Sequence, residues 1–235
     1  MVETKVLSNR QVSKDFYLMK VAGSYQAQMG QFCMLRAWDE VPVLSRPISI
    51  YDVDEEGISF LYKVVGQGTE IFAKLRAGDD IRLDGPYGNG FPNVSGKIAL
   101  VGGGIGVAPL YYTAKQLKAA GNQVDCYLGF TDESIMVEEY EQIADKVVIN
   151  IGGYIVNDVP VEEYDYIFTC GPHIMMQVLA DKVKGSDAKL YVSMENRMAC
   201  GAGACLVCTC KTNGGNKKVC KDGPVFLAEE VFFHA

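Results

Sequence analysis

The feature that most constrains this chain is a group of cysteines close to its C-terminal end. Four of them follow the pattern C-x4-C-x2-C-x11-C: Cys200, Cys205, Cys208 and Cys220. This is the spacing with which a tight loop wraps its thiolates around a plant-type [2Fe–2S] cluster. Gly201 and Gly203 let the backbone turn tightly and present N–H groups to the sulfurs. The pattern therefore predicts a one-electron carrier, which needs a donor and an acceptor.

Two alternatives stay open at this motif. Zinc also accepts four thiolates, but structural zinc sites usually pair two short C-x2-C knuckles, whereas here three ligands come from one loop. Cys210 could also compete with Cys220 as the fourth ligand. We expect a [2Fe–2S] cluster with Cys220 as that ligand.

The composition suits a globular chain and argues against nucleic-acid binding. With 235 residues, 49% of them hydrophobic, the chain can bury one large core or a few small ones. Its formal net charge of −7 would repel nucleic-acid phosphates. The first residues lack the apolar core of a signal peptide, and no run of about 18 apolar residues exists, so we expect no membrane span. Eight cysteines without a secretion signal favour metal or redox use in a reducing cytoplasm.

Up to about residue 92 the chain has short β-rich runs separated by Gly and Pro. The runs are residues 31–36, 48–51, 58–65 and 81–83. Their spacing predicts an antiparallel barrel or sandwich. One helix is expected over about residues 70–76, with Thr69 as its N-cap and Gly78 just past its end.

From Lys97 the pattern changes to strand, glycine-rich loop and helix. Residues 98–101 are a continuous apolar run, as expected for a strand buried on both faces, and helical spacing follows until Gly121. Further elements are expected in this part: strands over 124–128, 147–149, 166–170 and 190–193, and a helix over about 173–184. This alternation predicts a parallel sheet covered by helices.

The last forty or so residues are rich in Gly and Cys and show little periodicity. A segment this short needs a metal centre to organise it, because it cannot bury enough apolar surface alone. We therefore expect three modules: a barrel over residues 1–94, an α/β domain over 95–193 and a cluster module over 194–235.

The second motif is the sequence V-G-G-G-I-G-V-A-P, residues 101–109, between a strand and a helix. Glycines there let the backbone approach a pyrophosphate, and the helix N-terminus supplies N–H donors and a positive dipole end. Pro109 suits the first turn of that helix. The motif departs from the Rossmann fingerprint, because Val107 or Pro109 occupies the third glycine position. A tight turn without a ligand remains the alternative.

A third constellation lies in the barrel. Arg46 stands beside a proline-stiffened strand, and Gly66-Gln-Gly68-Thr69 opens a helix. Such groups could bind the phosphates and ring of a flavin. The alternative is an ordinary barrel with a charged rim and a capped helix.

The order of these motifs resembles the ferredoxin–NADP reductase superfamily. The motifs are Arg46-Pro-Ile-Ser49, Gly68-Thr69, Gly85-Pro-Tyr-Gly88, residues 102–109, Cys170-Gly-Pro172 and the cysteine loop. The C-terminal position of that loop, followed by Lys221-Asp-Gly-Pro-Val-Phe226, narrows the resemblance to the electron-transfer subunits of heteromeric (type B) dihydroorotate dehydrogenases. The match covers nearly the whole chain.

The resemblance implies that FAD, NAD and the cluster bind to separate sets of residues. FAD would lie on the barrel at Arg46, Pro47, Ile48, Ser49, Leu61, Tyr62, Lys63, Gly68 and Thr69. NAD would lie over Gly102, Gly103, Gly104, Gly106 and Pro109, with Cys170, Gly171 and Pro172 on the nicotinamide side. Cys200, Cys205, Cys208 and Cys220 would hold the cluster. No catalytic acid or base is expected.

NAD is favoured over NADP by the segment Gly129-Phe-Thr-Asp-Glu-Ser134. It is acidic and lacks Lys and Arg, so a 2′-phosphate would meet repulsion rather than a guanidinium.

The resemblance also implies an oxidoreductase subunit in pyrimidine biosynthesis. A partner subunit with FMN would oxidise dihydroorotate, and electrons would pass through the cluster and FAD to NAD⁺. We expect a heterotetramer with two copies of each subunit. One alternative is a flavin/iron–sulfur reductase subunit for a sulfur compound, a hydrogenase or an oxygenase component. Another is a non-enzymatic interaction module stapled by zinc, which would be colourless.

Overall fold

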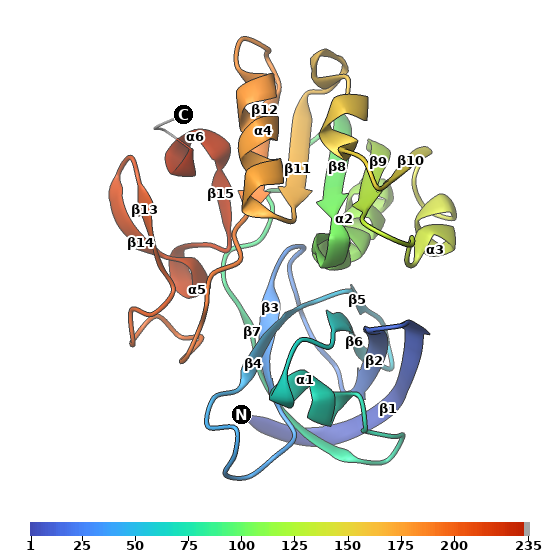
Figure 1. Cartoon of the computed structure of the whole chain (residues 1–235), viewed down its shortest axis with the longest axis vertical. Helices are drawn as coiled ribbons and strands as arrows, with labels where there is room; N and C mark the ends of the chain where they lie inside the picture. The colour runs from blue at the N-terminus through green and yellow to red at the C-terminus, as the bar shows by residue number, and fades with distance from the viewer. Residues whose placement is uncertain (233–235) are drawn as a thin grey trace.

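The computed structural model describes residues 1–232, which form two lobes, each built on one sheet (Figure 1). The first sheet has seven strands in the order β4-β3-β7-β1-β2-β6-β5, and every pairing in it is antiparallel. Its strands are β1 (Val2–Ser13), β2 (Phe16–Ala22), β3 (Phe32–Arg36), β4 (Arg46–Ser49), β5 (Asp52–Val53), β6 (Gly57–Lys63) and β7 (Asp80–Tyr87). The expected antiparallel barrel is therefore confirmed.

The sequence pattern did not predict β1 and β2. The first four residues of β1 pair with β7, and from Val6 onward β1 pairs with β2, so this long strand curves from one half of the barrel to the other. Register shifts lie between Val6 and Ser8 and between Gln11 and Ser13. Such irregularities break the two-residue alternation by which a strand is recognised in a sequence.

The helix expected over 70–76 lies earlier, as α1 (Gln67–Phe72), and Thr69 is not its N-cap. Gly66 occupies the N-cap, and Thr69 is the third residue of the helix. The Thr69 hydroxyl accepts hydrogen bonds from the N–H groups of Val65 (2.9 Å) and Gly66 (3.2 Å). Thr69 therefore stabilises the helix start from within the first turn, which the spacing alone could not distinguish from capping.

The second lobe contains the expected parallel sheet, in the order β10-β9-β8-β11-β12-β15. Five of its strands are parallel: β8 (Lys97–Gly103), β9 (Gln123–Phe130), β10 (Lys146–Ile151), β11 (Tyr166–Cys170) and β12 (Lys189–Ser193). The expected helices are present as α2 (Ala108–Ala119) and α4 (His173–Val183). Successive residues of β8 belong to different hydrophobic clusters. Leu100 shares one with Leu110 of α2, and Val101 shares the other with Leu179 of α4, so the two helices cover opposite faces.

Short elements complete this lobe and the C-terminal segment. They are the 3₁₀ turns η1 (Gly104–Val107), η2 (Ile155–Asp158) and η3 (Val161–Glu163), the helices α3 (Val137–Glu141), α5 (Val219–Asp222) and α6 (Ala228–Val231), and the hairpin β13 (Thr209–Thr212) with β14 (Gly215–Lys218). β15 (Val225–Leu227) pairs antiparallel with β12. The C-terminal segment therefore lends the parallel sheet its edge strand and lies beside both lobes (Figure 1). The end of the expected third module, residues 233–235, lies outside the described residues.

The two lobes contact each other through aromatic and charged side chains. Tyr51 stacks on Tyr111 with ring centroids 4.5 Å apart. Lys115 of α2 binds Asp52 of β5, with Nζ 2.8 Å from Oδ1. Between residues 1 and 232, no helix is long and apolar enough to cross a membrane.

Candidate cofactor sites and cluster loop

A cavity of ≈ 380 Å³ lies on the barrel where it faces the second lobe. Eight of the nine residues expected to bind FAD line it: Arg46, Pro47, Ile48, Ser49, Leu61, Tyr62, Lys63 and Thr69. The ninth, Gly68, lies beneath Arg46, because a Cβ added there would come within 2.5 Å of Arg46 Nε. A larger residue at position 68 would therefore push the Arg46 side chain away from its observed position.

The chemistry of this cavity fits a flat apolar ring that carries anionic phosphates. Ile48, Leu61 and Tyr62 provide an apolar wall. Arg46 stacks over Trp38 at 5.4 Å and forms no ion pair with any carboxylate of residues 1–232. Its Nη1 donates to the carbonyl oxygen of Leu44 at 2.5 Å, and its other N–H groups can still bind an anion such as a phosphate.

Sequence reasoning missed a second group of residues in the same cavity: Phe32, Val65, Ile105, Ala108, Ser193, Met194, Glu195, Asn196, Met198 and Pro224. Most of them follow β8 or β12, or come from the C-terminal segment, and topology alone brings them to the barrel. Ile105, Ala108 and Pro224 lie in motifs already noted, but those motifs gave no sign of contact with this cavity, and the others belong to no motif.

Glu195 occupies the junction between two cavities. It lines the ≈ 380 Å³ cavity just described, which is called the flavin cavity below, and a second cavity between the lobes. Its Oε1 lies 3.7 Å from the sulfur of Cys170. Burial raises the pKa of the Glu195 carboxyl above its ordinary value, and burial likewise raises the pKa of the Cys170 thiol. The pair therefore favours its neutral, protonated form.

The second cavity, of ≈ 560 Å³, lies in the cleft between the lobes. Five of the residues expected to bind NAD line it: Gly103, Gly104, Gly106, Gly171 and Pro172. Gly106 packs against the backbone of the 170–171 turn, since a Cβ added there would lie 2.3 Å from the carbonyl oxygen of Cys170. The glycines thus form a floor of bare backbone, as close approach to a pyrophosphate requires.

The remaining expected NAD residues lie behind this floor. Gly102 is buried in β8, where a Cβ would meet Val107 and Leu110, and Pro109 is the second residue of α2. Cys170 is 1% exposed at the end of β11. These residues shape the turn rather than line the cavity.

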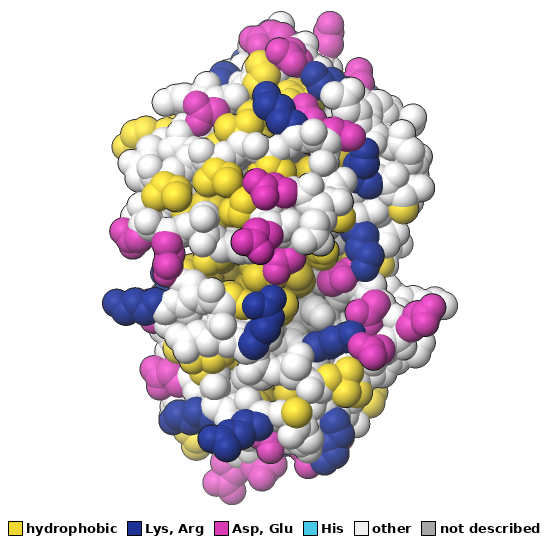
Figure 2. All heavy atoms as spheres, turned by 90° about the vertical axis from the view of Figure 1, so that its right-hand side faces the viewer, with side chains coloured by type: hydrophobic (Ala, Val, Ile, Leu, Met, Phe, Trp, Pro, Cys, Tyr) yellow, Lys and Arg dark blue, Asp and Glu magenta, His cyan; other side chains and the backbone are white. Residues whose placement is uncertain are grey.

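A third cavity, of ≈ 480 Å³, continues from the glycine turn over the ends of β9 and β10. It is lined by Gly103, Gly104, residues 129–131, residues 152–157, Pro172, Ile174, Met175 and Val178, with no Lys or Arg among them. Lys182 approaches its rim, but its Nζ is engaged by the carbonyl oxygens of Val156 (2.8 Å) and Asn157 (3.3 Å). The cavity therefore suits the adenosine of a nucleotide that has no 2′-phosphate. Figure 2 shows the face that carries α3, with acidic side chains above the hollow between the lobes and hydrophobic ones within it.

The cluster loop arranges its sulfurs in two pairs. The N–H groups of Ala202 and Cys205 point at the sulfur of Cys200, at 3.4 and 3.5 Å. These donors, with the nearby Cys205 thiol, lower the pKa of Cys200 to about 6. The N–H of Cys220 points at the sulfur of Cys208 at 3.4 Å, which defines the second pair. Two pairs of thiolates with N–H donors fit the two irons of a [2Fe–2S] cluster.

Cys210 packs near Cys208 but makes no hydrogen bond to either pair within the described residues. It is on β13, opposite Lys217 in the β13–β14 hairpin, and burial raises the pKa of its thiol. Cys220 is 2% exposed in α5, and burial beside Cys208 raises its pKa to about 11. All eight cysteines are free of disulfides. Among residues 1–232, no three His, Cys, Asp or Glu side chains are close enough to hold a single metal ion.

One edge of the loop faces solvent. Cys205 is exposed, and so are the apolar side chains of Leu206 (61%) and Val207 (54%). Leu206 also has a φ of +61°, a conformation that costs a non-glycine residue free energy. An apolar tip held outward beside a ligand is typical of a contact surface.

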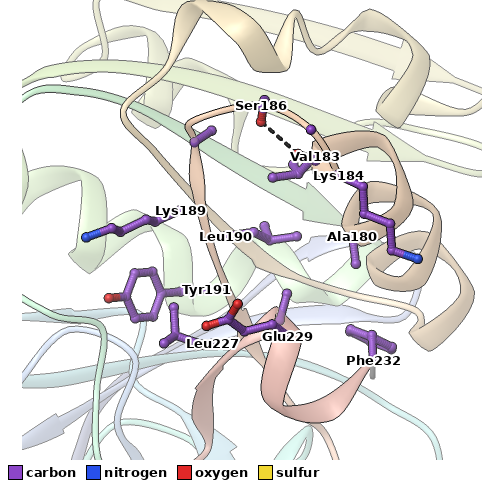
Figure 3. Close-up of a pocket in the computed structure, with 13 residues that line it drawn as sticks. Ala180, Val183, Lys184, Ser186, Lys189, Leu190, Tyr191, Leu227, Glu229 and Phe232 are labelled. Carbon is purple, nitrogen blue, oxygen red and sulfur yellow. Dashed lines mark hydrogen bonds between the residues drawn. The ribbon is translucent and has the colours of Figure 1, made fainter. Parts of the chain in front are cut away.

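A cavity larger than these three lies elsewhere and contains none of the expected site residues. It is a groove of ≈ 650 Å³ at the ends of α4, β12 and α6. Lys189, Tyr191 and Glu229 are among the side chains that line it (Figure 3). Size alone therefore does not identify the cofactor sites in this molecule.

Comparison with known proteins identifies the family. The model of the iron–sulfur cluster binding domain of dihydroorotate dehydrogenase B matches residues 195–232. The dihydroorotate dehydrogenase B (NAD⁺) electron transfer subunit of Clostridium acetobutylicum is 49% identical, over 98% of this chain and 96% of its own length. The corresponding subunit of Clostridium perfringens is 41% identical over 97% of each chain.

This chain belongs to the family of dihydroorotate dehydrogenase B electron transfer subunits. That membership confirms the resemblance inferred from the order of the motifs. Among solved structures, a chain of NADH-dependent reduced ferredoxin–NADP oxidoreductase, described in a study of flavin-based electron bifurcation, is 30% identical with a TM-score of 0.89, over 98% of this chain and 90% of that one. A ferredoxin–NADP⁺ reductase from Neisseria gonorrhoeae, 16% identical with a TM-score of 0.66, shares the fold over 83% of this chain and 94% of that one.

Proposed function

We propose that this chain is the electron-transfer subunit of a dihydroorotate dehydrogenase B. It passes electrons from an FMN-containing catalytic subunit through a [2Fe–2S] cluster and FAD to NAD⁺, in pyrimidine biosynthesis. The observation that carries the proposal is the contiguity of the three sites. Lys63 and Glu195 line both the flavin and the nucleotide cavity, and Pro224 of the flavin cavity follows Cys220 by four residues.

FAD, when bound, exchanges a hydride with the nicotinamide and single electrons with the cluster. The chain's own residues bind and orient these groups. Arg46 holds phosphates, Gly68 makes room for its side chain, and Ile48, Leu61 and Tyr62 exclude water from the ring. Glycines 103, 104 and 106 expose N–H groups to the nucleotide. Cys200, Cys205, Cys208 and Cys220 bind the cluster.

The proposal extends to organisation and location. We divide the chain into a flavin barrel (residues 1–94), an NAD domain (95–193) and a cluster module (194–235). The assembly is a cytoplasmic heterotetramer with two copies of each subunit. Support for a reducing compartment comes from eight free cysteines and the absence of any disulfide among residues 1–232.

The test of this function is the colour and reactivity of the purified chain. Prepared anaerobically, it should show both flavin and [2Fe–2S] absorption and should oxidise NADH when an artificial dye accepts the electrons. A zinc-stapled interaction module would be colourless and inert toward NADH. A chain without either chromophore would rule the proposed function out.

The exposed tip of the cluster loop provides a test of partner docking. Changing Leu206 or Val207 to Asp should weaken binding of the catalytic subunit by about 1–2 kcal/mol, or roughly five- to thirtyfold, because an apolar contact becomes a buried charge. The affinity would be measured by titrating one labelled subunit with the other. The matched control is Ile149→Asp on β10, a 40%-exposed apolar side chain remote from the cluster loop. Equal weakening by the control, or no weakening at the tip, would remove Leu206 and Val207 from the interface.

Glu195 supplies a prediction about pH. Because burial raises its pKa in the folded state above the ordinary 4.5, the folded protein prefers a protonated Glu195. The stability that protonated Glu195 contributes is therefore fully present below pH 4.5, and it is lost as the pH rises through the pKa of Glu195 in the folded state. Glu195→Gln should remove this loss, so the melting temperature of the variant should gain on that of the wild type as the pH rises above 4.5. Parallel curves for the two proteins would show that Glu195 is not held in its protonated form.

A second candidate function is suggested by one comparison. The chain of NADH-dependent reduced ferredoxin–NADP oxidoreductase shares the fold over 98% of this chain. A similar subunit could therefore serve an acceptor other than dihydroorotate dehydrogenase. Purification of the chain from its source with its bound partner separates the two functions, since only the first requires a partner that holds FMN and binds orotate.

A further inference from the structure

We propose that Phe32 and Tyr87 form the spacer through which electrons pass between the flavin cavity and the cluster loop. The proposal rests on the proposed function, because it needs a flavin and a cluster at the sites described. It assigns to two aromatic side chains of the barrel a role that no cysteine or glycine motif reveals.

The first contact of the spacer is with the flavin cavity. Phe32 lines that cavity and is 4% exposed. It faces Tyr87 across the β3–β7 pairing, in which the two residues are register partners. Their rings are tilted by 48°, with centroids 6.1 Å apart. Directly paired residues of an antiparallel sheet point to the same face, so the two rings lead from the cavity wall along one face of β3 and β7.

The second contact is with the cluster loop. Gly201, the residue after Cys200, packs on the same face of these two strands as Phe32 and Tyr87. A Cβ added to Gly201 would lie 3.6 Å from Cδ2 of Tyr87 and 2.6 Å from Cγ of Met34. The ring of Tyr87 therefore lies between Phe32 and the backbone beside a cluster ligand, and Met34 fills the space next to it.

The residues directly after Tyr87 hold the other side of the cluster module. The backbone N–H of Asn89 donates to the carbonyl oxygen of Gly223 at 2.5 Å. Its side-chain Nδ2 donates to the carbonyl oxygen of Asp222 at 3.1 Å. A Cβ added to Gly88 would lie 2.5 Å from Cδ of Pro224 and 3.2 Å from Cε1 of Phe32. Both the Cys200 side and the Cys220 side of the loop are thus fixed to one strand end, so the gap between the two sites is constant.

Transfer across this gap moves one electron at a time. In the direction of the proposed function, each event oxidises the cluster by one electron and reduces the flavin by one electron. NADH drives the same transfer in reverse, and no bond forms or breaks in either direction. Tunnelling slows steeply when packed atoms are replaced by a void, and a well-packed interior leaves few voids. A competing route exists along the chain itself, because Met198 lines the flavin cavity two residues before Cys200. The experiment must therefore distinguish the aromatic route from the main-chain route.

The test uses the full chain, purified anaerobically with both cofactors bound, and mixes it rapidly with NADH. Flavin bleaching reports hydride transfer, and freeze-quenched EPR reports the reduced cluster. Tyr87→Leu should leave flavin bleaching unchanged and slow cluster reduction roughly tenfold, equivalent to about 1.4 kcal/mol of activation free energy. Tyr87→Phe keeps the ring and should restore the wild-type rate. Tyr191→Leu, at a partly buried tyrosine of the separate groove, is the matched control and should behave as wild type.

A second readout separates the spacer from a merely structural role. Iron content, the reduction potential of the cluster and its fully reduced EPR spectrum should be the same in Tyr87→Leu and in the wild type. Unchanged cluster reduction in Tyr87→Leu would overturn the spacer in favour of the main-chain route, and equal slowing in Tyr87→Phe would overturn the role of the ring. Loss of the cluster or a shifted potential would likewise overturn it, because Tyr87 would then only support the loop. A wild-type chain without flavin or cluster would show instead that the proposed function itself is wrong.

Discussion

Replacing Cys220 with serine is expected to abolish the [2Fe–2S] cluster, whereas replacing Cys210 with serine should leave it intact. Cys220 is buried beside Cys208, and its N–H points at that sulfur at 3.4 Å, so its loss leaves one iron with a single thiolate. Cys210 lies on the β13–β14 hairpin opposite Lys217. Iron and acid-labile sulfide per chain, with the EPR signal of the reduced protein, measure the outcome.

The pair of variants is its own control, because each removes one thiol from the same short segment. Both should retain FAD, since neither cysteine lines the flavin cavity. Cluster loss in Cys210→Ser with retention in Cys220→Ser would show that the fourth ligand is Cys210. Retention in both would point to a ligand set outside this loop.

Arg46→Ala is expected to weaken FAD binding by about 1.5–3 kcal/mol, roughly ten- to hundredfold, the range for hydrogen bonds that involve a charged group. The guanidinium borders the flavin cavity, and no carboxylate of residues 1–232 forms an ion pair with it, so a bound phosphate would be its charged partner. Arg46→Lys keeps the positive charge but not the planar guanidinium that binds a phosphate through two N–H groups, so it should lose less FAD affinity than Arg46→Ala. Recovery of flavin fluorescence on dilution of the holoprotein measures the affinity.

The control for this change is Arg76→Ala, which removes an exposed arginine elsewhere on the barrel. It should bind FAD as tightly as the wild type. An equal effect of both substitutions would mean that the net charge of the barrel, not a specific phosphate contact, governs affinity. Unchanged affinity in Arg46→Ala would place the phosphates away from Arg46.

Much of the fold could be predicted because its signals are local. The run 98–101 is apolar throughout, and it forms a strand buried on both faces. The regularly spaced apolar residues after the glycines predicted α2, and its N-terminal turn differs only in being a 3₁₀ turn, η1. β1 gave no comparable signal, because bulges interrupt its alternation and Val6 is its one buried residue. Thr69 was placed as an N-cap because spacing does not distinguish a capping residue from the third residue of a helix.

The candidate site divides in the same way. Residues that belong to continuous motifs, such as Arg46 to Ser49 and the glycines after β8, were predicted and now line cavities. Glu195, Met198 and Pro224 were missed, because they reach the flavin cavity only through the position of β12 and β15 in the sheet. The choice of Cys220 over Cys210 as the fourth ligand stays a prediction. That choice depends on a hairpin that turns the chain between them.

The central claim is that this chain connects a dihydroorotate-oxidising subunit to NAD⁺ through its own cluster and flavin. The most direct test mixes the purified chain with its FMN-containing partner and measures NAD⁺ reduction driven by dihydroorotate. The wild-type pair should reduce NAD⁺, each subunit alone should fail, and a pair carrying Cys220→Ser should fail although the variant still oxidises NADH with a dye. Reduction of NAD⁺ by this chain without a partner, or by the pair that lacks the cluster, would contradict the account.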